Sequence, residues 1–217
     1  MNCFFAYSII FTLSNLKMEE KQPSLLHKVS RIISDFFNPL ISLIIFFIYM
    51  SIQKYNIKEA LQHFLPILGI VILPIIFWIV YHVKTGRYTN MDVSNRVQRK
   101  TLYIFIGICV LLYLAFTYIK YGSFDFVMLF ILILLLALQI SNYFIKSSMH
   151  TAFNIFVAAL FFSFDTYMGI VWLFIAILVG VTRVILKRHT PKEVILGAFI
   201  AFLVSFLYLY CDIQFRN

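Results

Sequence analysis

Long apolar runs separated by short polar segments dominate the pattern of the chain. The runs lie at residues 35–53, 64–84, 102–120, 124–145, 148–165, 167–186 and 191–210. Each run is close to the length of about 20 residues that an α-helix needs to cross about 30 Å of hydrocarbon. The runs lack the alternating polar residues of a membrane barrel, and backbone groups in lipid must be paired internally. The pattern predicts an all-α, polytopic membrane helical bundle of six or seven transmembrane helices. The run at 148–165 is its weakest span.

The ends of the chain differ from this membrane-embedded domain, which we place at residues 35–211. In the N-terminal segment, residues 1–34, the first 13 residues are apolar but lack the basic start and cleavage site of a signal peptide. Met18 is an alternative start, and a short interfacial or partly inserted helix is the other interpretation. Residues 17–31 are polar and predict a water-exposed segment. Residues 212–217 form a C-terminal tail.

The composition supports a membrane protein and limits its partners. Hydrophobic residues make up 62% of the 217 residues and charged residues 12%, which is too apolar for a water-soluble fold. The scattered Cys3, Cys109 and Cys211 indicate neither a disulfide framework nor a metal site, and no cofactor is indicated. The net charge of +9 comes from cations at the ends of apolar runs, which favours membrane lipid over nucleic acid as the partner. The sequence carries no indication of the oligomeric state.

Polar clusters occupy three boundaries between the runs, in the loops at 85–101, 146–150 and 187–191. Two predicted helices separate the first loop from the second, and two more separate the second from the third. All three loops therefore belong to one face of the membrane, and we expect them to meet. The excess of Lys and Arg on that face indicates the cytoplasm.

The third cluster carries a spaced motif: Thr182-Arg183, five residues, His189, three residues, Glu193, with Gly197 one turn later. This spacing resembles the Ser-Arg, five residues, His, three residues, Asp motif of the type 2 phosphatidic acid phosphatase superfamily, the integral-membrane lipid phosphatases. In that superfamily the active site more often faces away from the cytoplasm, so the resemblance and the charge count indicate opposite sides.

The other two clusters are similar to the remaining motifs of that superfamily, with departures. The family's Pro-Ser-Gly-His corresponds to Ser-Ser-Met-His at 147–150, which keeps the serine and the histidine. The family's lysine, six residues, Arg-Pro corresponds to Asp92, six residues, and Arg-Lys at 99–100, which keeps only the arginine. Lys146 or Arg96 is a candidate for the missing cation.

The resemblance implies a role for each matching residue. His189 attacks the phosphoryl group to form a phosphohistidine, and His150 protonates the leaving oxygen. Arg99 and Arg183 hold the phosphate oxygens. These roles suit the residue types, because imidazoles act as nucleophile and acid near pH 7 and guanidinium groups grip phosphate with paired hydrogen bonds. Backbone N–H groups near Ser148 are further candidate donors.

Glu193 has two interpretations. Thr190, Pro191 and Glu193 have the order of a helix start, with Thr190 as N-cap and Glu193 completing a capping box. In the other interpretation Glu193 orients and polarises His189, as the family's aspartate does. Either way His189 lies just outside a helix N-terminus, whose partial positive charge favours phosphate.

We therefore expect a metal-independent lipid phosphatase, a phosphoric monoester or pyrophosphate hydrolase, in a bacterial inner (cell) membrane. Its substrate's tail is expected to lie on Phe153, Phe156 and Leu160. Taken one at a time, the arginines are also consistent with cations that anchor helix ends at the membrane interface. His150 is likewise consistent with a histidine at a helix boundary that is hydrogen-bonded to a carbonyl. The main rival is a catalytically impaired relative that binds phospholipid headgroups or scaffolds a complex. A transporter or channel is disfavoured because the runs contain almost no mid-span charges.

Overall fold

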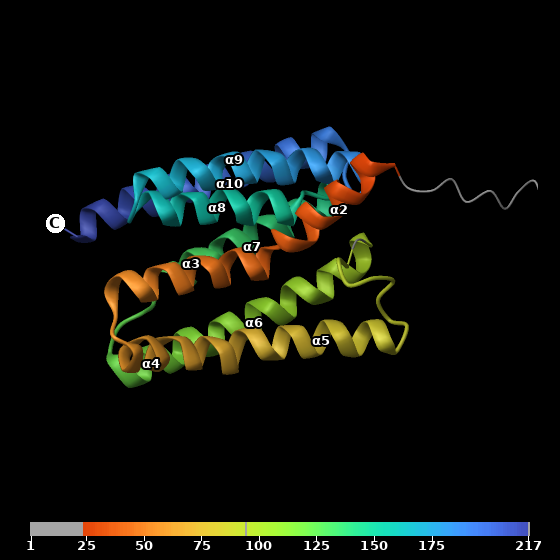
Figure 1. Ribbon diagram of the computed structural model, residues 1–217. Coiled ribbons are helices and arrows are strands. Elements are labelled where there is room, and N and C mark those ends of the chain that lie inside the picture. Colours follow the sequence, from red (N-terminus) through yellow and green to blue (C-terminus); the bar gives the residue numbers. More distant parts are fainter. Residues whose placement is uncertain (1–23, 94, 217) are drawn as a thin grey trace, which may run out of the picture.

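The computed structural model describes residues 24–93 and 95–216, and its regular structure there is entirely helical. The helices follow one another as α2 (Leu25–Phe36), α3 (Pro39–Lys54), α4 (Ile57–Ile67), the π-helix η1 (Leu68–Ile72), α5 (Leu73–Lys84), α6 (Arg96–Tyr121), α7 (Phe126–Phe144), α8 (Met149–Phe162), α9 (Thr166–Ile185) and α10 (Pro191–Arg216) (Figure 1). The predicted all-α fold class is confirmed. Helix α10 continues through most of the predicted C-terminal tail.

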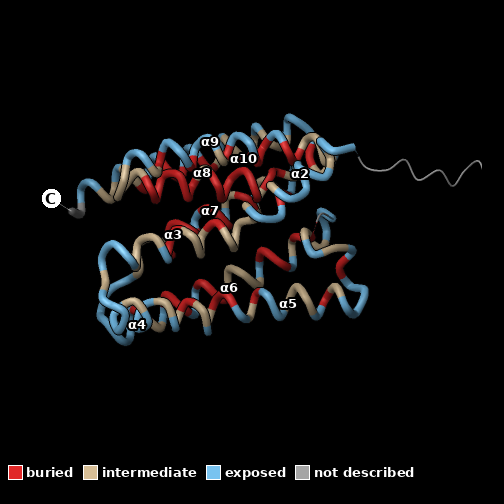
Figure 2. The backbone as a smooth tube through the Cα atoms, in the orientation of Figure 1, coloured by how far each residue is buried: buried red, intermediate tan, exposed pale blue. Residues whose placement is uncertain are grey.

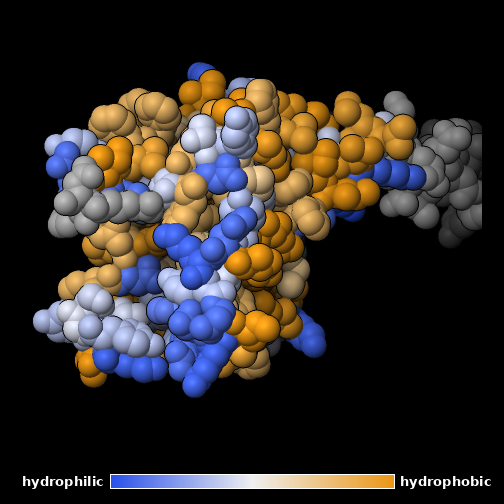
Figure 3. Space-filling model, turned by 60° about the vertical axis from the view of Figure 1, so that its left-hand side comes forward, coloured by the Kyte–Doolittle hydropathy of each residue, from blue (hydrophilic) through white to orange (hydrophobic). Residues whose placement is uncertain are grey.

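The described helices fit a multi-pass integral membrane protein. Five helical segments are long and apolar enough to cross a bilayer, with α4, η1 and α5 counted as one continuous segment, or six if the bent pair of α2 and α3 forms one span. The run expected at 148–165 is helix α8, whose 14 residues reach only about 21 Å at 1.5 Å per residue. By length alone it falls short of a span, so the described helices give five or six spans, and the upper figure agrees with the lower end of the six or seven predicted. Figure 3 shows hydrophilic side chains between apolar flanks at the end of the bundle where α3 meets α4, on the left in Figure 1.

The predicted first span, 35–53, is broken near its start. Asn38 caps α3 by accepting hydrogen bonds from the N–H groups of Leu40 and Ile41, and Pro39 occupies the first turn. The chain therefore bends by 55° between α2 and α3. The expectations for residues 1–13 and for Met18 lie outside the described residues.

Helix α2 includes part of the stretch predicted to be water-exposed. It packs against α9 and buries Ser30 and Ser34 while exposing Leu25, Ile32 and Phe36. Small polar residues at a helix contact and large apolar residues outside are the pattern expected in lipid, where apolar surface need not be hidden.

The core lies around α8, which packs against α3, α9 and α10 (Figure 2). Eleven of its 14 residues are buried. Phe156 and Leu160 are among them, each 0% exposed, so they face the protein core. This corrects the expectation that they contact a substrate tail in lipid. Phe153 lines a cavity described below.

Candidate active site

The three polar loops meet at one end of the bundle. The Arg99 guanidinium on α6 donates from Nη1 to the Ser147 carbonyl at 2.9 Å. The Ser148 N–H donates to the Glu193 carbonyl at 3.0 Å. The Lys146 ammonium donates to the Arg188 carbonyl at 2.9 Å. These contacts join segments that lie between 42 and 48 residues apart in the chain.

A tight turn between α9 and α10 positions His189. The Arg183 carbonyl near the end of α9 accepts from the N–H groups of Arg188 at 3.0 Å and His189 at 3.3 Å. Lys187 reverses the chain with a φ of 54°, in the left-handed region. Helix α10 then begins at Pro191, where the fixed φ and missing N–H of proline suit a first helical position. The imidazole is thereby held between two helix ends.

Glu193 makes the contacts that both interpretations of its position require. Its Oε2 atom lies 2.9 Å from His189 Nδ1 and accepts from the Thr190 N–H at 3.1 Å. The Glu193 N–H in turn donates to Thr190 Oγ1 at 3.3 Å, which completes the capping box. Because a carboxylate only accepts, His189 carries its proton on Nδ1 and keeps a lone pair on Nε2. That Nε2 is buried and has no hydrogen-bond partner in the described protein.

The surroundings of His189 keep its imidazole neutral. Burial lowers its pKa most, and the charges of Arg99, Lys146 and Arg183 lower it further, to about 2. These three cations come from α6, from the loop before α8 and from α9. A neutral imidazole with an unprotonated, unpartnered Nε2 is the form that can act as a nucleophile.

Arg183 is the most buried cation of the cluster, at 0% exposure. Its Nη1 atom donates to Asp92 Oδ2 at 2.8 Å and to Ser34 Oγ at 2.9 Å. Its Nε and Nη2 atoms have no partner in the described protein. A buried guanidinium with spare donors is an anion-binding group, because each unpaired buried donor carries a desolvation cost that an anion removes.

His150 and Ser148 lie at the start of α8, above the packed core. His150 Nε2 is buried 3.6 Å from Asp92 Oδ1, too far for a hydrogen bond. Ser148 caps α8: its Oγ accepts from the Thr151 N–H at 3.4 Å. Its own N–H is occupied by the Glu193 carbonyl, so it does not serve the anion-binding role expected of that group.

Gly197 allows this close approach of α10 to the start of α8. A Cβ atom at that position would lie 2.7 Å from the Ser148 carbonyl oxygen, closer than real Cβ contacts allow. The glycine is therefore needed to bring the Glu193 segment onto the Ser148 backbone.

The structure separates the remaining predicted cations. Arg99 is 2% exposed and also donates from Nε to the Val93 carbonyl at 3.3 Å, so it lies inside the cluster. Lys146 lies at its edge, where burial and then the charge of Arg99 lower the pKa of its ammonium. Arg96 is turned away, because its guanidinium binds the carbonyls of Asn142 and Tyr143 at the end of α7. The structure does not bring Arg96 to the histidines.

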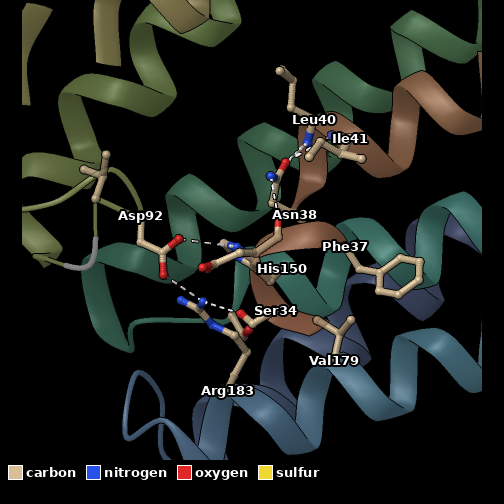
Figure 4. Close-up of polar contacts among 12 residues, drawn as sticks. Ser34, Phe37, Asn38, Leu40, Ile41, Asp92, His150, Val179 and Arg183 are labelled. Carbon is tan, nitrogen blue, oxygen red and sulfur yellow. Dashed lines mark hydrogen bonds and ion pairs between the residues drawn. The ribbon is translucent and has the colours of Figure 1, made fainter. Parts of the chain in front are cut away.

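Asp92 is the residue to which sequence analysis gave no role. It extends from the loop between α5 and α6 toward Arg183 and His150 (Figure 4). Burial would raise the pKa of its carboxyl, but the charges of His150, when protonated, and of Arg183 and Arg188 hold it below its usual value. Asp92 is therefore ionised at neutral pH. Asp92 is the lone acidic residue between Lys84 and Lys120, and this isolation was the signal that could have singled it out. The sequence did not indicate its partners, because they lie on helices distant in the chain.

A cavity of about 550 Å³ leads from this cluster into the bundle. Its polar lining comprises Arg31, Asp35, Asn38, Asn90, Asp92, His150 and Arg188, and the other lining residues are apolar and extend as far as Phe47 and Ile67. Its wall along α5, η1 and α4 runs from Ile79 to Ile67, about 18 Å at the rise of a helix. The size is that of a small-molecule site, and the shape joins a polar end to a long apolar interior.

Residues 140–216 match the model of the PAP2 superfamily. The matched part holds α8, α9 and α10 with the second and third motifs, and it confirms the resemblance to the type 2 phosphatidic acid phosphatase superfamily there. The similarity to this superfamily therefore covers about a third of the chain. No curated protein and no solved structure matches the chain.

Proposed function

We propose that this protein is a membrane phosphatase that hydrolyses a lipid phosphomonoester or a prenyl pyrophosphate through a phosphohistidine at His189. One observation carries the proposal: His189 is neutral, its Nδ1 is held by Glu193, and its Nε2 is buried without a partner beside Arg99 and Arg183. A histidine kept in this form in a cluster of cations suits attack on a phosphate.

The reaction divides into two steps. His189 Nε2 attacks phosphorus, the bond to the leaving oxygen breaks, and His150 gives that oxygen its proton. The free Nε and Nη2 donors of Arg183 bind the phosphoryl oxygens, where negative charge is held in the transition state. Water then attacks phosphorus, His150 takes the proton of that water, the bond between phosphorus and His189 Nε2 breaks, and orthophosphate leaves. Histidine supplies the nucleophile and guanidinium groups bind the charge, so the proposal names no metal.

The cavity supports a lipid as the substrate. Its polar end contains His150, and its apolar interior of about 18 Å can hold a hydrocarbon chain while the phosphate stays at the end of the bundle. Phe153 and Met149 on α8 line it between these ends. The multi-pass fold is consistent with a bacterial inner (cell) membrane, which we propose as the location.

A second candidate is a non-hydrolytic relative that binds phospholipid headgroups. The observation in its favour is Asp92, which stands where the superfamily motif has a lysine and is paired with Arg183 at 2.8 Å. A carboxylate there opposes phosphate binding unless it moves.

The test is phosphate release by purified protein in detergent from phosphatidic acid, phosphatidylglycerol phosphate and undecaprenyl pyrophosphate. We expect release by the wild type, loss of release with His189→Ala, and an acid-labile phosphohistidine trapped at position 189. His63→Ala is the matched control, because His63 lies on α4 stacked against Tyr55 at the other end of the bundle. Release by the wild type no greater than that of His189→Ala would refute the enzyme and leave the headgroup-binding relative.

A further inference from the structure

Asp92 lies between the apolar cavity and the spare anion-binding donors. The cavity is lined by Asp92 and His150 but by neither Arg183 nor His189. The carboxylate reaches across, with Oδ2 on Arg183 at 2.8 Å and Oδ1 facing His150 Nε2 at 3.6 Å (Figure 4). A phosphate entering from the cavity therefore meets this carboxylate before it meets Arg183.

We propose that the Asp92 carboxylate is a built-in anion that occupies part of the phosphate site, and that a substrate phosphate must displace it from Arg183 and His150. This inference rests on the proposed function, because it takes Arg183 and His150 as the groups that receive phosphate. It makes Asp92 a residue that sets how tightly the site holds phosphate.

The geometry is that of a ligand mimic. A carboxylate presents two oxygens from one planar group, as one edge of a phosphate does, and guanidinium groups bind both. Asp92 places one oxygen on the guanidinium and the other opposite the imidazole that the proposed reaction assigns to the leaving oxygen. The Nε and Nη2 donors of Arg183 and the Nε2 of His189 stay unpartnered in the described protein, so the carboxylate fills only part of the site.

Displacement requires movement of Asp92 rather than of its partners. Arg183 is 0% exposed and is also held by Ser34, whereas the Asp92 side chain is 21% exposed and borders the cavity. The backbone beside it is fixed: the Val93 side chain is 1% exposed, and the Val93 carbonyl accepts from Arg99. A rotation of the carboxylate toward the cavity is thus the movement available, without opening of the loop.

Self-occupancy has a measurable consequence. When the ligand-competent form is only a fraction of the population, the apparent affinity falls by that fraction. A site that is self-occupied about 90–99% of the time binds phosphate about 10- to 100-fold more weakly than the same site without the carboxylate. It also releases the orthophosphate product more easily, because Asp92 competes for Arg183 in both directions.

The test is the affinity of the purified full chain for orthovanadate and for inorganic phosphate, measured by calorimetry in detergent. We expect Asp92→Asn, which keeps an oxygen for Arg183 but removes the charge, to tighten binding about 10- to 100-fold and to lower KM. Glu59→Gln is the control, because Glu59 is an exposed carboxylate on α4, at the other end of the bundle (Figure 1). The control is expected to leave the affinity unchanged.

Unchanged or weaker binding by Asp92→Asn, with a fall in kcat, would overturn the proposal and make Asp92 a positioning residue for His150. If Asp92→Asn does not fold, as thermal unfolding would show, Asp92→Ser takes its place and carries the same expectation. Binding and turnover separate the two proposals. If Asp92→Asn binds phosphate more tightly but no variant hydrolyses a substrate, the proposal for Asp92 stands and the proposed phosphatase activity is refuted. If the protein hydrolyses a substrate but Asp92→Asn binds phosphate no more tightly, the phosphatase stands and the proposal for Asp92 is refuted.

Discussion

Two layers of the molecule are built differently, although both contribute to the candidate site. In the layer of α8, α9 and α10, α8 alone buries 11 of its 14 residues. In the layer of α4, η1, α5 and α6, helix α4 buries only Ile67 and α5 buries only Ile75 and His82, whereas α6 buries eight of its 26 residues. The cavity is lined by residues of this layer together with residues of α2, α3, α7 and α8.

The difference separates two tasks. The packed layer holds His189, Glu193, Arg183 and His150, whose geometry the proposed phosphoryl transfer would have to fix closely. The looser layer supplies Asp92 and one wall of the cavity. The match to the PAP2 superfamily covers residues 140–216, which include the packed layer but not Asp92. The two histidines and Glu193 therefore belong to one set of helices, and Asp92 and Arg99 to the other.

The largest effect is expected within the packed layer, at Glu193. Glu193→Gln keeps the helix start but removes the charge that holds the proton on His189 Nδ1. By analogy with other carboxylate–histidine pairs, kcat should fall roughly 10²- to 10⁴-fold. Thr190→Ala is the control, since it removes the cap alone and should cost about 1 kcal/mol of stability with kcat little changed. Equal losses of kcat in both variants would reduce Glu193 to a capping residue.

The next effect concerns the contact between the layers. Arg99→Met leaves the carbonyls of Ser147 and Val93 without their buried donor and should lower the free energy of unfolding by about 2–4 kcal/mol. Arg96→Met, which alters an exposed guanidinium on the end of α7, should cost less than about 1 kcal/mol. Denaturant unfolding in detergent measures both. A larger loss from Arg96 would show that the layers are joined elsewhere.

A pair of glycines compares the packing of the layers directly. Gly197→Ala forces a Cβ to 2.7 Å from the Ser148 carbonyl and should destabilise by about 1–3 kcal/mol. Gly69→Ala, in η1, meets nothing within 4 Å and should stabilise by up to about 1 kcal/mol, because alanine favours a helix more. Thermal unfolding gives the sign of each change. The same sign at both positions would contradict the difference in packing.

The smallest effect is a shift in pH dependence. The pKa of His189 lies below the usual 6.5, so the imidazole stays neutral as the pH falls through 6.5. The fall of kcat/KM on the acid side should therefore occur at a pH below 6.5. Lys146→Met removes a positive charge that lowers this pKa, so the pKa rises and the limb moves to higher pH. Lys192→Met, at an exposed position on α10, should leave the profile in place. A shift to lower pH in Lys146→Met would contradict the electrostatic origin.

Stability should follow the same sign. A histidine with a lowered pKa in the folded state stabilises the protein fully above pH 6.5, and this contribution is lost as pH falls toward the lowered pKa, because the unfolded chain takes up the proton first. His189→Gln should flatten this part of the stability profile.

Several features followed from the sequence because they depend on local order. Apolar run length predicted the all-α fold, and the spacing of Thr190 and Glu193 predicted the capping box. Loop parity predicted that the clusters around Arg99, His150 and His189 lie at one end. The predictions that were wrong concerned the length of a helix and the direction of its side chains. The length of the apolar run did not reveal that α8 stops at 14 residues or that Phe156 faces the core.

The sequence by itself determined which residue types stand at each helix end, because hydrophobic periods, caps and motif spacings are properties of neighbouring residues. Only the tertiary structure decided their partners. It turned Arg96 to the end of α7, gave the Ser148 N–H to Glu193, and set Asp92 on Arg183 across 91 residues of chain. Such contacts depend on how each helix is packed and rotated about its axis. The spacing of residues along the chain does not determine that rotation, so it does not determine which partner a side chain meets.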